Sequence, residues 1–237
     1  DDRRFDRVAY SLRANVESSG NLLYLATSAI NAPKNSDGQY TFLNIAYAQY
    51  VKGDIDLTTR VKIDSRNSIV MHMGLGIAYP YGNSRILPFE KRYFSGGANG
   101  MRGWTVRTLG PGSYRSKGSN IDFINQSGDM KLDLNVEYRS HLFWRLHSAV
   151  FVDAGNIWTL RSYKEQPGGQ FAFGRFYKEL AFSYGLGVRL ELDMFVFRLD
   201  AAMKAVNPAY SGKEKFPIIT PNFNRDFALH FAIGYPF

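Results

Sequence analysis

Residues that could carry out catalysis are few and scattered in this sequence. The four histidines, His72, His141, His147 and His230, have none of the spacings at which side chains bind a metal. The sequence has no Gly-x-Ser-x-Gly nucleophile motif and no cysteine. Ser183 and His230 would share a polar strand face, but a hydrolase also needs an acidic residue that converges on them. We therefore expect no catalytic residues, no metal and no cofactor, and we predict that the protein is not an enzyme.

Composition narrows the classes of protein to which the chain can belong. The 237 residues include 29 Lys and Arg against 21 Asp and Glu, which gives a formal net charge of +8. These basic residues are spread along the chain rather than clustered, so we do not expect a nucleic-acid partner. No apolar stretch approaches the roughly 20 residues that a membrane-spanning helix requires. A helical membrane protein is therefore excluded.

Alternation of apolar and polar residues with a period of two is the dominant pattern of the sequence. In residues 130–139, Leu132 and Leu134 would point to one side of a strand, and Lys131 and Asp133 to the other. The pattern recurs, and we predict strands at about 8–17, 43–63, 69–79, 130–139, 147–158, 182–191, 197–204 and 227–237. Strands of about ten residues are long enough to cross a bilayer when they are tilted.

The connections between these segments alternate strictly in length. The long loops are at about 20–40, 80–128, 159–178 and 207–225, and the short links are at 64–68, 141–146 and 193–194. Outer-membrane barrels have short periplasmic turns and long outer loops, whereas a soluble sandwich has no reason to sort its loops by side. We therefore predict an all-β fold over residues 1–237, an antiparallel transmembrane β-barrel portion of eight strands with both termini at the periplasm.

Alternation alone cannot decide whether the apolar strand face meets lipid or forms a soluble core. The polar face mixes charges of both signs, as expected of an interior whose charges pair, and includes Arg13, Lys131, Glu137, Arg189, Glu191, Arg198, Asp200 and Lys204. Aromatic residues gather near strand ends, as in interfacial girdles, at Tyr79, Tyr81, Tyr138, Phe143, Trp144, Trp158, Phe195, Tyr235 and Phe237. Both features favour a membrane barrel, and a soluble β-barrel is the alternative.

Three motifs occur in order along the chain. Residues 87–97 read LPFEKRYFSGG and are followed by MRGW at 101–104. Residues 151–158 read FVDAGNIW, and the last strand, with its aromatic residues outward, ends as FAIGYPF. From about residue 41 to the end, the chain closely resembles the BamA/TamA superfamily of outer-membrane protein assembly factors, also called bacterial surface antigens. MRGW departs conservatively from the family pattern at its first and last positions. The predicted C-terminal strand signal comprises Phe231, Tyr235 and Phe237.

The long loop would bring a buried charge into the barrel. Its motif consists of Gly96, Gly97, Arg102, Gly103 and Trp104, and the glycines allow tight turns. An unpaired buried arginine is very costly, and strand parity offers Glu137 and Asp153 as acceptors. The resemblance implies the same partners, because in the family this loop arginine is held by an Asp and a Glu of the barrel wall. We therefore expect a lumen lock of Arg102, Glu137 and Asp153; the alternative is that Arg102 is a solvated loop cation.

The resemblance also implies a larger whole and a function. The family's barrel has sixteen strands preceded by POTRA domains, so eight strands suggest its C-terminal half, or else a closed eight-stranded barrel. The implied function is assembly, insertion or translocation of outer-membrane proteins in the outer membrane of a Gram-negative bacterium. A two-partner-type secretion pore and a barrel anchor for a passenger domain are the alternatives.

Partners follow from the same resemblance. They would be outer-membrane lipids, unfolded client proteins, accessory assembly subunits and the missing N-terminal half of the barrel. In the family, a weak seam beside the last strand opens toward lipid. Pro236 fits such a seam, because a proline cannot donate a hydrogen bond to a neighbouring strand.

Overall fold

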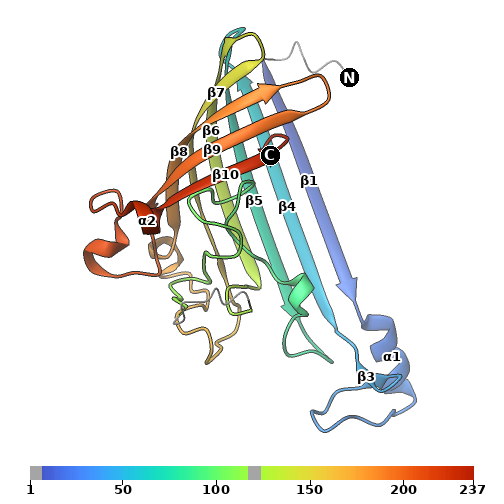
Figure 1. Ribbon diagram of the computed structural model, residues 1–237. Coiled ribbons are helices and arrows are strands. Elements are labelled where there is room, and N and C mark those ends of the chain that lie inside the picture. The colour runs from blue at the N-terminus through green and yellow to red at the C-terminus, as the bar shows by residue number, and fades with distance from the viewer. Residues whose placement is uncertain (1–6, 117–123) are drawn as a thin grey trace.

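One antiparallel sheet dominates the computed structural model, which describes residues 7–116 and 124–237 (Figure 1). Its eight strands follow one another in chain order. They are β1 (Val8–Ser19), β4 (Tyr50–Lys62), β5 (Asn67–Pro80), β6 (Met130–Phe143), β7 (Leu146–Trp158), β8 (Ala181–Glu191), β9 (Val196–Val206) and β10 (Phe227–Ile233). Each strand lies at a predicted position, which confirms the all-β antiparallel prediction.

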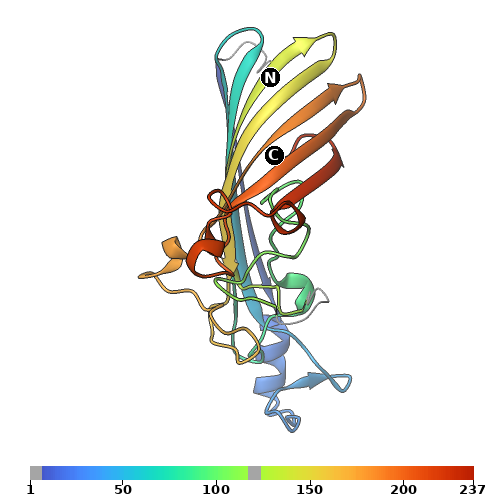
Figure 2. The ribbon, with the colours of Figure 1, turned by 60° about the vertical axis from the view of Figure 1, so that its left-hand side comes forward.

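Long and short connections separate to the two ends of the sheet (Figures 1 and 2). The short turns are residues 63–66, 144–145 and 192–195, and the long loops are 20–49, 81–129, 159–180 and 207–226. The loops contain α1 (Asn21–Ala29), β2 (Thr41–Phe42), β3 (Ile45–Ala46), η1 (Phe89–Lys91), η2 (Phe176–Lys178), η3 (Gly212–Lys215) and α2 (Phe223–Asp226). In residues 7–116 and 124–237, no helix is long and apolar enough to cross a bilayer.

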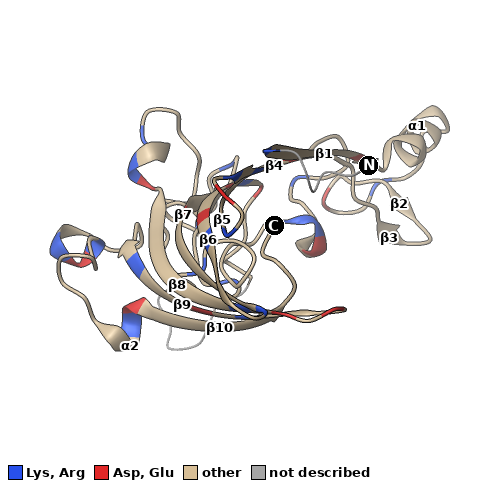
Figure 3. Ribbon diagram, turned by 90° about the horizontal axis from the view of Figure 1, so that it is seen from above, with Lys and Arg blue, Asp and Glu red and all other residues tan. Residues whose placement is uncertain are grey.

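The sheet is an open curve rather than a closed barrel. Over the described residues, β1 pairs with β4 alone, and β10 pairs with β9 alone. Viewed from above, β1 and β10 lie at the two ends of the curve, and the loop between β5 and β6 lies on its concave side (Figure 3). Both edges therefore present unpaired backbone groups.

Burial shows which face of the strands is apolar. On β6 and β7, the outward-pointing Val136 and Val152 are half exposed, whereas the inward-pointing Glu137 and Asp153 are fully buried. A soluble barrel would bury the valines and expose the carboxylates. The apolar face is therefore the outer one, as in a barrel surrounded by lipid, and this settles the choice that alternation left open.

Some local expectations were wrong. The predicted strand at 43–63 is divided, because β3 ends at Ala46 and β4 begins at Tyr50. The predicted loop after the first strand contains the helix α1, which strand periodicity did not indicate. Trp158 does not belong to an interfacial girdle: it is fully buried, and its indole Nε1–H donates to Glu179 Oε2 at 2.8 Å. The loop at 159–180 covers this side chain.

Candidate functional site

The loop between β5 and β6 folds back on itself through two glycines. Gly96 and Gly97 have φ of 101° and 95°, which side chains rarely adopt. A Cβ on Gly96 would lie 2.2 Å from the carbonyl oxygen of Thr105. The Gly97 amide donates to the carbonyl of Trp104 at 2.8 Å, which closes a compact turn. This turn carries Arg102 toward the concave face of the sheet.

Arg102 is fully buried and is held by Asp153 of β7. Its Nε and Nη2 donate to the two oxygens of Asp153 at 2.9 and 2.7 Å, and its backbone amide donates to Oδ2 at 3.1 Å. Paired bonds of this kind match the planar guanidinium to a planar carboxylate. Asp153 therefore fixes both the side chain and the backbone of the loop at this point.

Glu137 of β6 supplies the second carboxylate. It accepts a hydrogen bond from Arg102 Nη1, and both side chains are fully buried. The guanidinium also lies over the ring of Phe151, 3.5 Å from its centroid. Burial alone would lower the pKa of Arg102, but the hydrogen bonds to Asp153 and the charges of both carboxylates outweigh it and raise the pKa above its usual value. The structure thus brings together Arg102, Glu137 and Asp153.

Gly103 and Trp104 pack the loop against β8 and β9. The Gly103 amide donates to Ser183 Oγ at 3.2 Å, and a Cβ on Gly103 would lie 2.6 Å from the Cβ of Ser183. Glycine is therefore needed here for close approach to the wall. Trp104 is 3% exposed and packs in an apolar cluster with Met101, Leu109 and Ala181.

Further charged residues extend this site beyond the predicted trio. Glu137 also accepts from Arg139 Nε at 2.7 Å and from Arg189 Nη2 at 3.1 Å. Arg189 pairs in turn with Asp200, and Arg198 Nη2 donates to Asn99 of the loop at 2.6 Å. Sequence parity placed these side chains on the polar face but did not identify their partners, because pairing depends on strand register and on the path of the loop.

Two polar side chains considered for hydrolysis bind the loop instead. Ser183 Oγ accepts from the Gly103 amide, as described above. His230 Nε2 donates to the carbonyl oxygen of Arg102 at 2.8 Å. Both side chains are therefore occupied in positioning the loop backbone.

The end of the chain departs from the predicted outward strand. Phe231 does point outward, where it is 68% exposed and stacks on Phe197. However, β10 ends at Ile233, and Gly234 takes φ 94°. Tyr235 and Phe237 therefore turn inward instead of continuing the outer aromatic row. Their contacts are with Arg139, which lies 4.3 Å from the Tyr235 ring centroid, and with His72, whose ring stacks on Phe237 at 5.1 Å.

An apolar outer surface, a charged inner face and a long loop folded against that face are typical of a β-barrel membrane protein. Residues 18–237 match the Omp85 superfamily domain, and the chain therefore belongs to the Omp85 superfamily. Members of this family are β-barrels of the Gram-negative outer membrane, which is the location of this protein. The family assignment confirms the resemblance seen in the motifs.

Individual relatives match at low identity. The outer membrane protein assembly factor BamA of Neisseria meningitidis serogroup B (strain ATCC BAA-335 / MC58) is 25% identical over 122 residues, 49% of this chain and 15% of that protein. The structure of BamA from Haemophilus ducreyi lacking POTRA domains 1–3 matches with a TM-score of 0.54 at 15% identity. That match covers 96% of this chain and 50% of the other. CdiB from Acinetobacter baumannii matches with a TM-score of 0.46 at 16% identity, over 79% of this chain and 27% of the other. The chain thus spans half or less of the length of each.

Proposed function

We propose that this chain is the barrel portion of a factor that assembles, inserts or translocates outer-membrane proteins without enzymatic chemistry. The observation that carries the proposal is the contrast between a wall held by the lumen lock and the short last strand β10, which over the described residues pairs with β9 alone. A free edge in lipid must be satisfied by another strand, because lipid offers no hydrogen-bonding groups. A client strand can supply those groups by adding to the edge.

The two edges differ in ways that suit a seam. β1 is 12 residues long, whereas β10 has 7 and ends where Gly234 turns the chain inward. β10 is therefore shorter than the roughly nine residues that a tilted spanning strand requires. Fewer backbone hydrogen bonds would hold a neighbouring strand along β10, which favours its exchange for a client strand.

The lumen lock has a supporting role in this proposal. It holds the loop of residues 81–129 against β6 and β7, so that this wall keeps its shape while a neighbouring edge changes partner. The partners we propose are outer-membrane lipids on the apolar face, unfolded clients at the β10 edge, accessory assembly subunits and the remaining half of the barrel. The family membership of the chain and its likeness to BamA support this set.

Site-specific crosslinking tests the proposed edge. The sequence contains no cysteine, so single cysteines can be introduced without background. We would place one at Leu229 of β10. The matched controls are Leu12 of β1, which the remaining half of the barrel would cover, and Val136, which is outward and exposed but lies in the middle of the sheet. The substrate is a labelled outer-membrane barrel protein with one cysteine in its last strand, supplied during insertion.

Crosslinks at Leu229→Cys, but not at Leu12→Cys or Val136→Cys, are the expected result. Equal crosslinking at all three positions would show collision in the membrane rather than strand addition, and would contradict the proposal. Repeating the assay with several unrelated barrel clients separates assembly from secretion, because a two-partner-type pore would accept a single substrate.

A further inference from the structure

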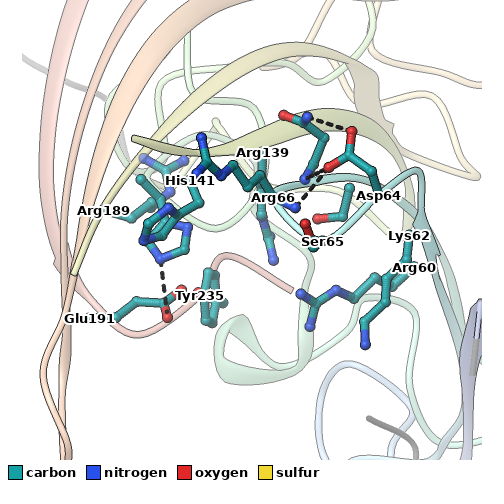
Figure 4. Close-up of a pocket in the computed structure, with 13 residues that line it drawn as sticks. Arg60, Lys62, Asp64, Ser65, Arg66, Arg139, His141, Arg189, Glu191 and Tyr235 are labelled. Carbon is teal, nitrogen blue, oxygen red and sulfur yellow. Dashed lines mark hydrogen bonds and ion pairs between the residues drawn. The ribbon is translucent and has the colours of Figure 1, made fainter. Parts of the chain in front are cut away.

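A polar pocket of about 150 Å³ lies at the turn end of the sheet, away from the lumen lock's loop motif (Figure 4). Its walls come from β4, the turn at 63–66, β6, β8 and the inward-turned end of the chain. In Figure 4, Arg60 and Lys62 lie on one side of the pocket, Glu191 lies on the other, and Tyr235 lies between them. The volume corresponds to roughly five water molecules, enough for a small charged group.

Cations dominate this pocket. Five arginine and lysine side chains line it, against two carboxylates; the five are Arg60, Lys62, Arg66, Arg139 and Arg189. Lys62 of β4 and Arg139 of β6 lie opposite Ser68 in the strand register, one on each side of β5. Their backbones therefore lie two strand spacings, about 10 Å, apart, so the β4 and β6 walls of the pocket are within reach of one small group.

Both carboxylates of the pocket already have partners. Asp64 accepts hydrogen bonds from the backbone amides of Arg66 and Asn67 at 2.7 and 2.8 Å, which holds the turn together. Glu191 lies 3.4 Å from His147 Nε2. Within the part of the chain that the structure describes, neither carboxylate forms an ion pair with Arg60 or Arg139, so neither neutralises these two guanidinium groups.

Hydrogen-bond donors are also left open. Arg139 is nine-tenths buried and is held by Glu137 through Nε and by the Tyr235 ring, yet its Nη2 has no hydrogen-bond partner. Arg60 and Arg66 are exposed, and within residues 7–116 and 124–237 no hydrogen bond or ion pair of either side chain is seen. A buried guanidinium nitrogen without a partner is costly, so Nη2 of Arg139 is a donor that a bound group can complete.

We propose that this pocket binds an oxyanion, the carboxylate of an acidic polypeptide segment that enters from the turn end. The paired N–H donors of a guanidinium match the two oxygens of a carboxylate in geometry. Arg139 is already held in place by Glu137 and by the Tyr235 ring. Arg60 and Arg139 point to the concave side of the sheet, away from the apolar outer surface. The location therefore favours a polypeptide over a lipid headgroup.

Calorimetric titration tests the pocket with the protein purified from outer membranes in detergent. The probes are a tetraglutamate peptide, a tetraglutamine peptide and inorganic phosphate. The variant is the double substitution Arg60→Gln with Arg66→Gln. It removes two exposed positive charges and breaks no side-chain hydrogen bond within the described residues. The matched control is Arg13→Gln with Arg85→Gln, which removes the same charge from exposed positions outside the pocket. Retention of the folded band on unheated gels verifies that each variant is folded.

Tetraglutamate is expected to bind and tetraglutamine is not. The pocket variant should weaken tetraglutamate binding by about tenfold or more, since each charge-assisted bond is worth roughly that factor, whereas the control variant should stay within about twofold. Equal weakening in both variants would reduce the effect to net charge and overturn the site. Phosphate binding that matches tetraglutamate in strength and in its loss in the variant would overturn the assignment to a polypeptide.

Discussion

The middle of the curved sheet and its β1 edge share one sequence pattern but differ in what covers them. On β6, the inward-pointing Asp133, Asn135 and Glu137 are at most 2% exposed. On β1, no residue of either face is buried, and inward-pointing Arg13 is exposed. Alternation therefore decides which way a side chain points, but the loop of residues 81–129 decides whether it is buried.

This difference in burial changes how much a charged side chain contributes to stability. Arg102 and its carboxylates are removed from water, so each depends on the others. At the loop end of β1, Lys91 pairs with Glu17, but the two side chains stay 38% and 42% exposed. Water screens such a pair, and its contribution is small. We therefore expect the stability of the sheet to be concentrated in β6 to β9, and the β10 edge to be free to change partner.

The largest expected effect is at the lumen lock. Arg102→Ala leaves Asp153 buried without the arginine that pairs with it and removes one of the three arginines that pair with Glu137. We expect the free energy of unfolding to fall by about 3–5 kcal/mol. The same change at exposed Arg13, Arg13→Ala, should alter it by about 0.5 kcal/mol or less. Urea unfolding in lipid vesicles, followed by tryptophan fluorescence, measures both. Similar losses of unfolding free energy in Arg102→Ala and Arg13→Ala would contradict the contrast between the covered middle of the sheet and the exposed β1 edge.

A second effect, of intermediate size, tests the close approach at Gly103. A Cβ there would lie 2.6 Å from the Cβ of Ser183, so Gly103→Ala should lower the free energy of unfolding by about 1–3 kcal/mol. The control is Gly53→Ala on β4, where a Cβ would meet nothing within 4 Å. Adding Ser183→Gly to the first variant should restore part of the loss. If it restores none, contact with Ser183 is not the cause.

The smallest effect concerns the inward turn of the chain end. Gly234→Ala places a side chain at φ 94° and should cost about 1 kcal/mol. Gly38→Ala, at φ 76° in the β1–β4 connection, is a control with similar backbone strain. Only Gly234→Ala should change the proton resonances of His72, because Phe237 stacks on that ring. Unchanged His72 resonances in Gly234→Ala would show that the turn does not depend on this glycine.

Much of the fold followed from local pattern. Period-two alternation located the strands, and the lengths of the links separated turns from loops, because both features arise within one element. The prediction of the partners of Arg102 combined strand parity with the family resemblance. Parity alone allowed several inward carboxylates and could not exclude a solvated arginine.

The parts that were missed depend on long-range geometry. The pairing of Arg189 with Glu137 joins β8 to β6 across the curve, which no local pattern encodes. The inward turn of Tyr235 and Phe237 reverses the parity of β10, and the positive φ of Gly234 allows it. A glycine followed by Tyr235 and Pro236 was the available signal, since proline cannot continue a ladder. Pro236 predicts a loosened strand there, whereas the structure has a turn.

Hydrogen exchange of the loop tests the central claim most directly. The claim is that Arg102 holds the loop against the wall, and the amides of Gly97 and Gly103 report on it through their bonds to Trp104 and Ser183. With Arg102→Gln, we predict that exchange at both amides accelerates by at least about tenfold while the β6–β7 ladder stays protected. Unchanged exchange at Gly97 and Gly103 would show that the loop is held without Arg102, and would contradict the account.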